Sequence, residues 1–150
     1  MVLERFGEPL QLRQVPVPRL GVDEALVRIT ACGLCGTDLK ISAGKLEGTP
    51  LPLIMGHEPA GQVVEVGAGV RNVQVGDQVA VHFYVTCGVC EFCRTNRNSL
   101  CSNLSGRLGF ELDGGFAEFV KAPAGSIASI LTACARTGCS GLAMLWRKRT

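Results

Sequence analysis

Four cysteines within fifteen residues constrain this chain more than any other feature of its sequence. The run CGVCEFCRTNRNSLC has the spacing C-x2-C-x2-C-x7-C and contains Cys87, Cys90, Cys93 and Cys101. The two-residue gaps let the first three sulfurs turn inward from a tight loop. The seven-residue gap then lets the chain loop back and bring the fourth sulfur close to them. A closed shell of four thiolates is typical of structural zinc, whose binding contributes about 10–16 kcal/mol and would order this loop of low apolar content. Disulfides or unconnected thiols are the alternative.

The composition is that of a globular chain. Hydrophobic residues make up 47% of the 150 residues, charged residues make up 19%, and the formal net charge is +2. This balance predicts no nucleic acid and no membrane as partners. The N-terminus has charges where a signal peptide has its apolar core, and no apolar run approaches the length of a bilayer span. We therefore expect a cytoplasmic protein with reduced thiols, which favours metal over disulfides.

Short strands separated by turns that contain glycine and proline predict a mainly β chain, folded as an antiparallel barrel or a sandwich. Four strands are predicted, at residues 25–31, 60–66, 78–83 and 116–122. Residues 39–46 are expected to form one or two helical turns. The pattern changes near Ile130, so residues 1–130 are interpreted as one domain and residues 131–150 as an atypical tail. The basic end of that tail is expected to be a solvated or disordered terminus, with contact to an acidic partner as the alternative.

Cys35, His57 and Glu58 form a second group of metal-ligating residue types. One cysteine and one histidine with a nearby carboxylate are suitable ligands for a catalytic zinc ion. Glu58 is interpreted either as a ligand or as a close neighbour of the ligands. Asp38 is expected to accept a hydrogen bond from the ring N–H of His57 that does not bind metal, which would fix the histidine tautomer.

Several motifs resemble those of medium-chain zinc-dependent alcohol dehydrogenases and occur in the same order. They are Cys35-Gly36-Thr37-Asp38, Gly56-His57-Glu58-Pro59-Ala60-Gly61 with the later Gly67 and Val70, Val75-Gly76-Asp77-Gln78-Val79, the four-cysteine run, and Asp113-Gly114-Gly115-Phe116-Ala117-Glu118. The similarity covers roughly residues 1–130. It implies a GroES-like antiparallel β-barrel with short helices and a zinc-binding loop lobe, which is the catalytic domain of such enzymes.

The resemblance also implies roles for single residues. Cys35 and His57 match catalytic zinc ligands, and Glu58 matches a carboxylate that binds or approaches the metal. Thr37 matches the hydroxyl that relays the alcohol proton. Asp38 matches the carboxylate that supports the zinc histidine.

The implied activity is oxidation of a primary or secondary alcohol or a polyol to an aldehyde or ketone, with NAD or NADP as hydride acceptor. The four cysteines match the structural zinc shell of the family, away from the chemistry. Phe83 falls near a position that lines the substrate pocket in relatives. A homo-oligomer is a further expectation, because oligomers are common in this family.

Two departures from the family pattern limit these implications. Relatives bind the dinucleotide through G-x-G-x-x-G in a further domain, whereas Gly67-Ala68-Gly69 lacks the third glycine and joins two predicted strands. NAD or NADP is therefore expected only when such a domain is supplied. The third catalytic ligand has no matching segment after Ile130, so Cys134 and Cys139 are the alternatives, and weak binding of the second zinc without turnover is expected. A frameshift or truncation near residue 130 would explain both departures.

An inactive zinc-binding β-barrel module or fragment is the alternative function. Its support is the missing dinucleotide fingerprint, whereas the motifs around Cys35 and His57 favour the oxidoreductase. A cysteine-rich nucleic-acid module is a weaker idea. Arg94 and Arg97 lie in the cysteine run, but no recognition helix is predicted after it.

Overall fold

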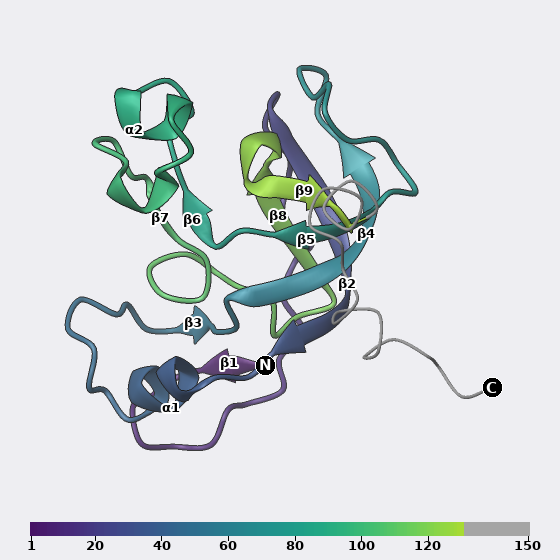
Figure 1. Ribbon diagram of the computed structural model, residues 1–150. Helices are drawn as coiled ribbons and strands as arrows, with labels where there is room; N and C mark the ends of the chain where they lie inside the picture. The colour runs from purple at the N-terminus through teal and green to yellow at the C-terminus, as the bar shows by residue number, and fades with distance from the viewer. Residues whose placement is uncertain (131–150) are drawn as a thin grey trace, which may run out of the picture.

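A five-stranded antiparallel sheet forms the centre of the computed structural model, which describes residues 1–130 (Figure 1). The strand order is β8-β2-β4-β5-β9. The strands are β2 (Glu24–Gly33), β4 (Glu58–Val66), β5 (Gln78–Val81), β8 (Phe119–Pro123) and β9 (Ile127–Ser129). The sheet curls around the long strands β2 and β4 into a half-barrel. The predicted mainly β, antiparallel fold class is therefore confirmed.

The main hydrophobic core lies against this sheet. Strand β4 alternates buried and less buried positions through much of its length, which is the pattern of a sheet with one face turned toward a core. Fully buried valines and alanines come from neighbouring strands that pair far apart in sequence, as in the contact of Val27 on β2 with Val120 on β8. The core cluster consists of Ala25, Val27, Val63, Val70, Val73, Val79, Val81, Leu108, Val120, Ala122, Ala124 and Ile127.

A smaller core joins the N-terminus to helix α1 (Gly36–Ser42). Strand β1 (Val2–Leu3) pairs antiparallel with β3 (Leu53–Ile54). Leu3, Ile41, Leu53 and Met55 are buried together with Phe110. Because Met55 lies two residues before His57, this core holds the segment that leads from β3 to β4.

A two-stranded hairpin carries the four-cysteine loop. Its strands are β6 (Tyr84–Val85) and β7 (Gly106–Arg107), which pair antiparallel. The loop between them contains helix α2 (Glu91–Arg94) and the 3-10 turn η1 (Asn98–Leu100), and it stands apart from the sheet as a separate lobe (Figure 1). A second 3-10 turn, η2 (Ala124–Ser126), connects β8 to β9. No residue of α2 or η1 is buried, so apolar packing contributes little to the order of this loop.

Three predicted elements have different ends, each for a local reason. The helix predicted at 39–46 spans Gly36–Ser42, because a capping box at Cys35 starts it earlier and Gly44, at φ +69°, ends it. The strand predicted at 78–83 ends at Val81, since the His82 N–H donates to the carbonyl oxygen of Ser126 at 2.7 Å. The strand predicted at 116–122 begins at Phe119, since the Phe116 N–H donates to Met55 instead, at 2.9 Å.

Helices within residues 1–130 are short. Helix α1 has 7 residues and α2 has 4. In this part of the chain, no helix has both the length and the apolar character that a membrane crossing requires.

Gly61 is required where β2 and β4 pair. It lies opposite Ile29, and a Cβ atom at this position would overlap the backbone carbonyl of Arg28. We expect Gly61→Ala to destabilise the fold by about 1–3 kcal/mol, because neither backbone can move without disturbing the ladder. Urea unfolding followed by circular dichroism measures the change. Gly125→Ala is the matched control, since no atom lies within 4 Å of the added methyl group, and equal stabilities of the two variants would contradict the prediction.

Candidate metal centres

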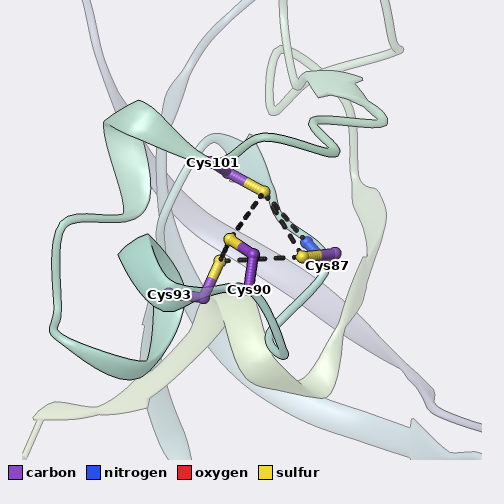
Figure 2. A group of neighbouring side chains, drawn as sticks. All are labelled: Cys87, Cys90, Cys93 and Cys101. Atoms are coloured by element: carbon purple, nitrogen blue, oxygen red, sulfur yellow. Dashed lines mark hydrogen bonds between the residues drawn. The ribbon is translucent and has the colours of Figure 1, made fainter.

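The four cysteines of the lobe converge on one point. Their sulfur atoms lie within 4.8 Å of one another, and Figure 2 shows them turned inward from both sides of the loop. Four of the pairwise separations are 3.5 Å (Cys90–Cys93), 3.6 Å (Cys87–Cys101), 3.9 Å (Cys90–Cys101) and 4.0 Å (Cys87–Cys93). Four sulfurs at about 2.3 Å from a central zinc ion in tetrahedral geometry would be about 3.8 Å apart. The donor set and its spacing therefore fit zinc.

Backbone N–H groups around this shell favour thiolate sulfur. The Cys87 and Asn103 N–H groups both donate to Cys101 Sγ at 3.4 Å, and the resulting stabilisation of the anion lowers the pKa of Cys101. A backbone hydrogen bond from Cys93 is the largest cause that lowers the pKa of Cys90, to about 6. Desolvation, and then the hydrogen bonds shared with Cys90 and Cys101, raises the pKa of Cys93 to about 11. Backbone N–H groups that point at Cys90 and Cys101 therefore favour the thiolate form, which is the form that binds a metal cation.

Cys35, His57 and Glu58 also come together, although they belong to different elements. Cys35 is the N-cap residue of α1, His57 lies in the loop before β4, and Glu58 begins β4. Cys35 Sγ is 3.2 Å from His57 Nε2, and Glu58 Oε1 is 4.0 Å from the same nitrogen. The three side chains offer one sulfur, one nitrogen and one oxygen within 4.8 Å of one another. This mixed donor set suits a catalytic zinc ion.

The start of helix α1 places Cys35 and Asp38. The Cys35 N–H donates to Asp38 Oδ2 at 2.9 Å, and the Thr37 N–H donates to Cys35 Sγ at 3.2 Å. The first turn of the helix therefore fixes the Cys35 backbone through one local hydrogen bond and its sulfur through another. Thr37 is half-buried in this same turn, beside the sulfur.

A buried carboxylate faces the other nitrogen of His57. Asp38 is 1% exposed and His57 is 6% exposed, and Asp38 Oδ1 lies 3.3 Å from His57 Nδ1. This contact does not meet hydrogen-bond geometry, and among residues 1–130 neither of these two atoms has a hydrogen-bond partner. A proton on Nδ1 would suit the facing carboxylate and would leave the Nε2 lone pair for the side of Cys35 and Glu58, which is the tautomer that a metal ligand requires.

Two groups of three or more such ligand-type side chains occur in the described part of the chain, and they are the two that the sequence singles out. The proposed third ligands Cys134 and Cys139 lie outside the described residues. Cys32 has the two-residue spacing to Cys35 that is common in metal sites, but it does not join the cluster. Its sulfur faces Gly56 and Gly115, and burial raises its pKa to about 11.

Sequence reasoning misses the aromatic surroundings of His57. The Phe83 ring meets the imidazole edge-on at a centroid distance of 5.5 Å, and the Phe110 ring lies at 5.1 Å. Phe83 is thus close to the cluster, as its predicted place near the pocket requires. Phe110 carries no signal in the sequence, because its contact with His57 depends on the turn after β7.

Comparison with known proteins points to the family that the sequence motifs resemble. Residues 21–132 match the model of the alcohol dehydrogenase GroES-like domain. An alcohol dehydrogenase of Geobacillus stearothermophilus is 46% identical over 132 residues, which are 86% of this chain and 38% of that protein. An NAD-dependent alcohol dehydrogenase of Sulfolobus acidocaldarius is 36% identical over 129 residues, 82% of this chain and 37% of that protein.

A solved structure is also similar. The alcohol dehydrogenase of Aeropyrum pernix superposes with a TM-score of 0.79 at 37% identity, over 86% of this chain and 38% of that one. The chain thus spans about two-fifths of the length of these relatives. The half-barrel, the metal-ligating motifs and the matched residues agree, and the chain belongs to the zinc-dependent alcohol dehydrogenase family, of which it matches the GroES-like domain.

Proposed function

We propose that this chain is the zinc-binding catalytic domain of an NAD(P)-dependent alcohol dehydrogenase. The observation that carries the proposal is the cluster of Cys35, His57 and Glu58, with the buried Asp38 carboxylate behind the histidine. The substrate class is a small primary or secondary alcohol or polyol, and the product is the aldehyde or ketone. NAD or NADP accepts the hydride in a dinucleotide-binding domain of the kind that the relatives' additional length can accommodate.

The residues of the cluster have separate tasks in this mechanism. Zinc, when bound by Cys35 and His57 with Glu58 as ligand or neighbour, supplies Lewis-acid polarisation of the alcohol oxygen. Asp38 holds the proton of His57 Nδ1 and keeps Nε2 free as a ligand. The Thr37 N–H donates to Cys35 Sγ and positions that ligand, and the Thr37 hydroxyl passes the alcohol proton toward solvent. A nicotinamide cofactor, when bound, would supply the two-electron hydride acceptor that oxidation of the alcohol requires.

The four-cysteine centre is proposed to hold a structural zinc ion. Its shell is complete with Cys87, Cys90, Cys93 and Cys101, which leaves no open coordination position for a substrate. We further propose that residues 1–130 form one domain, that the protein is cytoplasmic, and that it forms homo-oligomers. The proposed location agrees with the six cysteines in the described residues, which form no disulfides.

An inactive zinc-binding module remains the second candidate. It is favoured by the lack of G-x-G-x-x-G in this sequence. Fluorescence titration with NADH distinguishes the two candidates, since absence of binding at millimolar NADH would leave the module for the chain in isolation.

Metal stoichiometry tests the proposed function. With zinc supplied in excess, we expect two zinc ions per chain by elemental analysis, the second bound weakly at Cys35 and His57. A chelator should remove that second ion first, because its cluster offers fewer thiolates. Cys35→Ser should lower the stoichiometry to one and leave the four-cysteine centre filled. A single zinc in the unmodified chain, retained in Cys35→Ser, would contradict the proposed catalytic centre.

A further inference from the structure

Aromatic rings surround the imidazole of His57. Phe110 is inclined at 58° to it and Phe83 at 72°, while the two phenyl rings stack on each other at 5.6 Å. The contact with Asp38 fixes the position of Nδ1, but a single polar contact leaves the ring free to tilt about that atom. The two phenyl rings restrict this tilt, because each packs against a different part of the imidazole.

Arg107 holds the Phe110 ring. Its guanidinium carbon lies 4.5 Å from the ring centroid, in the geometry of a cation–π contact. Glu111 in turn holds Arg107, since Arg107 Nε lies 3.0 Å from Glu111 Oε1 and 3.1 Å from Oε2, and Arg107 Nη2 also donates to Oε1. The Glu111 carboxylate accepts the Arg107 backbone N–H at 2.9 Å as well. This ion pair lowers the pKa of Glu111, so both side chains stay charged near neutrality.

The hairpin β6–β7 ties these groups to one frame. Tyr84 pairs with Arg107, and the Leu108 N–H donates to the carbonyl oxygen of Phe83 at 2.8 Å. Phe83 therefore enters the hairpin and Phe110 leaves it, and both project from its base toward His57. The four-cysteine loop closes the opposite end of the same hairpin.

We propose that Arg107 and Phe110 are positioning residues for the metal ligand His57, an inference that rests on the proposed function. Arg107, fixed by Glu111, holds the Phe110 ring, and the rings of Phe110 and Phe83 keep Nε2 directed at Cys35 and Glu58. Neither residue has an atom that binds the metal, so the role acts through the orientation of the imidazole alone.

Cobalt(II) binding tests this role. The full chain is first loaded with one equivalent of zinc to fill the four-cysteine centre, and cobalt is then titrated while its visible absorption is followed. Arg107→Met keeps the apolar stem but removes the guanidinium, and we expect roughly tenfold weaker cobalt binding at the Cys35–His57–Glu58 centre. Arg28→Met is the matched control, because Arg28 makes a comparable contact with Phe119 on the sheet, at 5.7 Å. The cobalt affinity of this variant should equal that of the unmodified chain.

Phe110→Leu provides a second variant, which keeps an apolar side chain but removes the aromatic ring. We expect its loss of cobalt affinity to equal or exceed that of Arg107→Met. The ring nitrogens of His57, observed by NMR and assigned with the help of His82→Gln, should show mixed tautomers in both variants and one tautomer in the unmodified chain.

Each outcome is distinct. Equal cobalt affinities and one tautomer in all proteins would overturn the positioning role and leave the proposed function intact. Loss of zinc from the four-cysteine centre together with loss of cobalt would show general unfolding, and it also overturns the role. No cobalt binding by the unmodified chain would overturn the proposed function, and this role with it.

Discussion

Cys101→Ser is expected to empty the four-cysteine centre and to unfold the loop at residues 86–105 while the main sheet stays folded. Structural zinc contributes about 10–16 kcal/mol to such sites, and a shell with one thiolate replaced by a hydroxyl loses most of that free energy. No residue of α2 or η1 is buried, so no packing remains to keep the loop in place. Elemental analysis should show the loss of one zinc ion per chain.

Digestion with trypsin tests directly whether this loop unfolds. Arg94 and Arg97 lie in the loop, and rapid cleavage after them is expected in Cys101→Ser but not in the zinc-loaded chain. Cys32→Ser is the matched control, because Cys32 lies outside the four-cysteine centre and its replacement should leave that loop protected. Protection of Arg94 and Arg97 in Cys101→Ser would show that the loop holds its shape without metal.

His57→Ala is expected to remove the second metal and to destabilise the fold by about 3 kcal/mol, even in a chain that carries zinc only at the four-cysteine centre. The loss arises because the carboxyl group of Asp38, 1% exposed, loses the imidazole that faces its Oδ1 atom and is left buried without a partner there. The two phenyl rings also lose the imidazole on which they pack. Urea unfolding with one zinc equivalent per chain measures the change.

A second substitution separates these causes. The double variant His57→Ala, Asp38→Asn should recover about 1 kcal/mol or more, because the amide is neutral and its oxygen can still accept the Cys35 N–H. His82→Ala is the control, since His82 is exposed and its ring also stacks on Phe83, and it should change stability by about 1 kcal/mol or less. A double variant as unstable as His57→Ala alone would assign the loss to packing and not to the buried charge.

The parts of both centres that depend on local spacing could be predicted from the sequence. The four cysteines lie within one loop, so two-residue gaps and one return are enough to expect their convergence. Cys35 and Asp38 also meet through a local pattern, the capping box of α1, although the helix predicted at 39–46 missed this start. The meeting of Cys35 with His57 is not local. Their residue types made it a candidate, and the similarity of the surrounding motifs to a known family strengthened that prediction.

What the sequence could not predict depends on tertiary hydrogen bonds. Residues 113–116 resemble the start of a strand, but Gly114, Gly115 and Phe116 donate their N–H groups to Ile54, Gly56 and Met55. These bonds draw the segment beneath the His57 loop and delay β8 until Phe119. The aromatic contacts of Phe110 have the same origin, because the turn at Gly109, with φ +78°, directs the ring inward.

The pairing of β2 with β8 has a consequence for synthesis of the chain. Glu24 pairs with Pro123, so one edge of β2 has no partner until nearly one hundred further residues have left the ribosome. The thiols of the lobe need only their own short loop, and metal capture there can come first. A nascent chain that pauses between these two events would present a long, apolar strand edge to other chains. Aggregation during expression is therefore expected to depend on how quickly residues 119–123, which form β8, are synthesised.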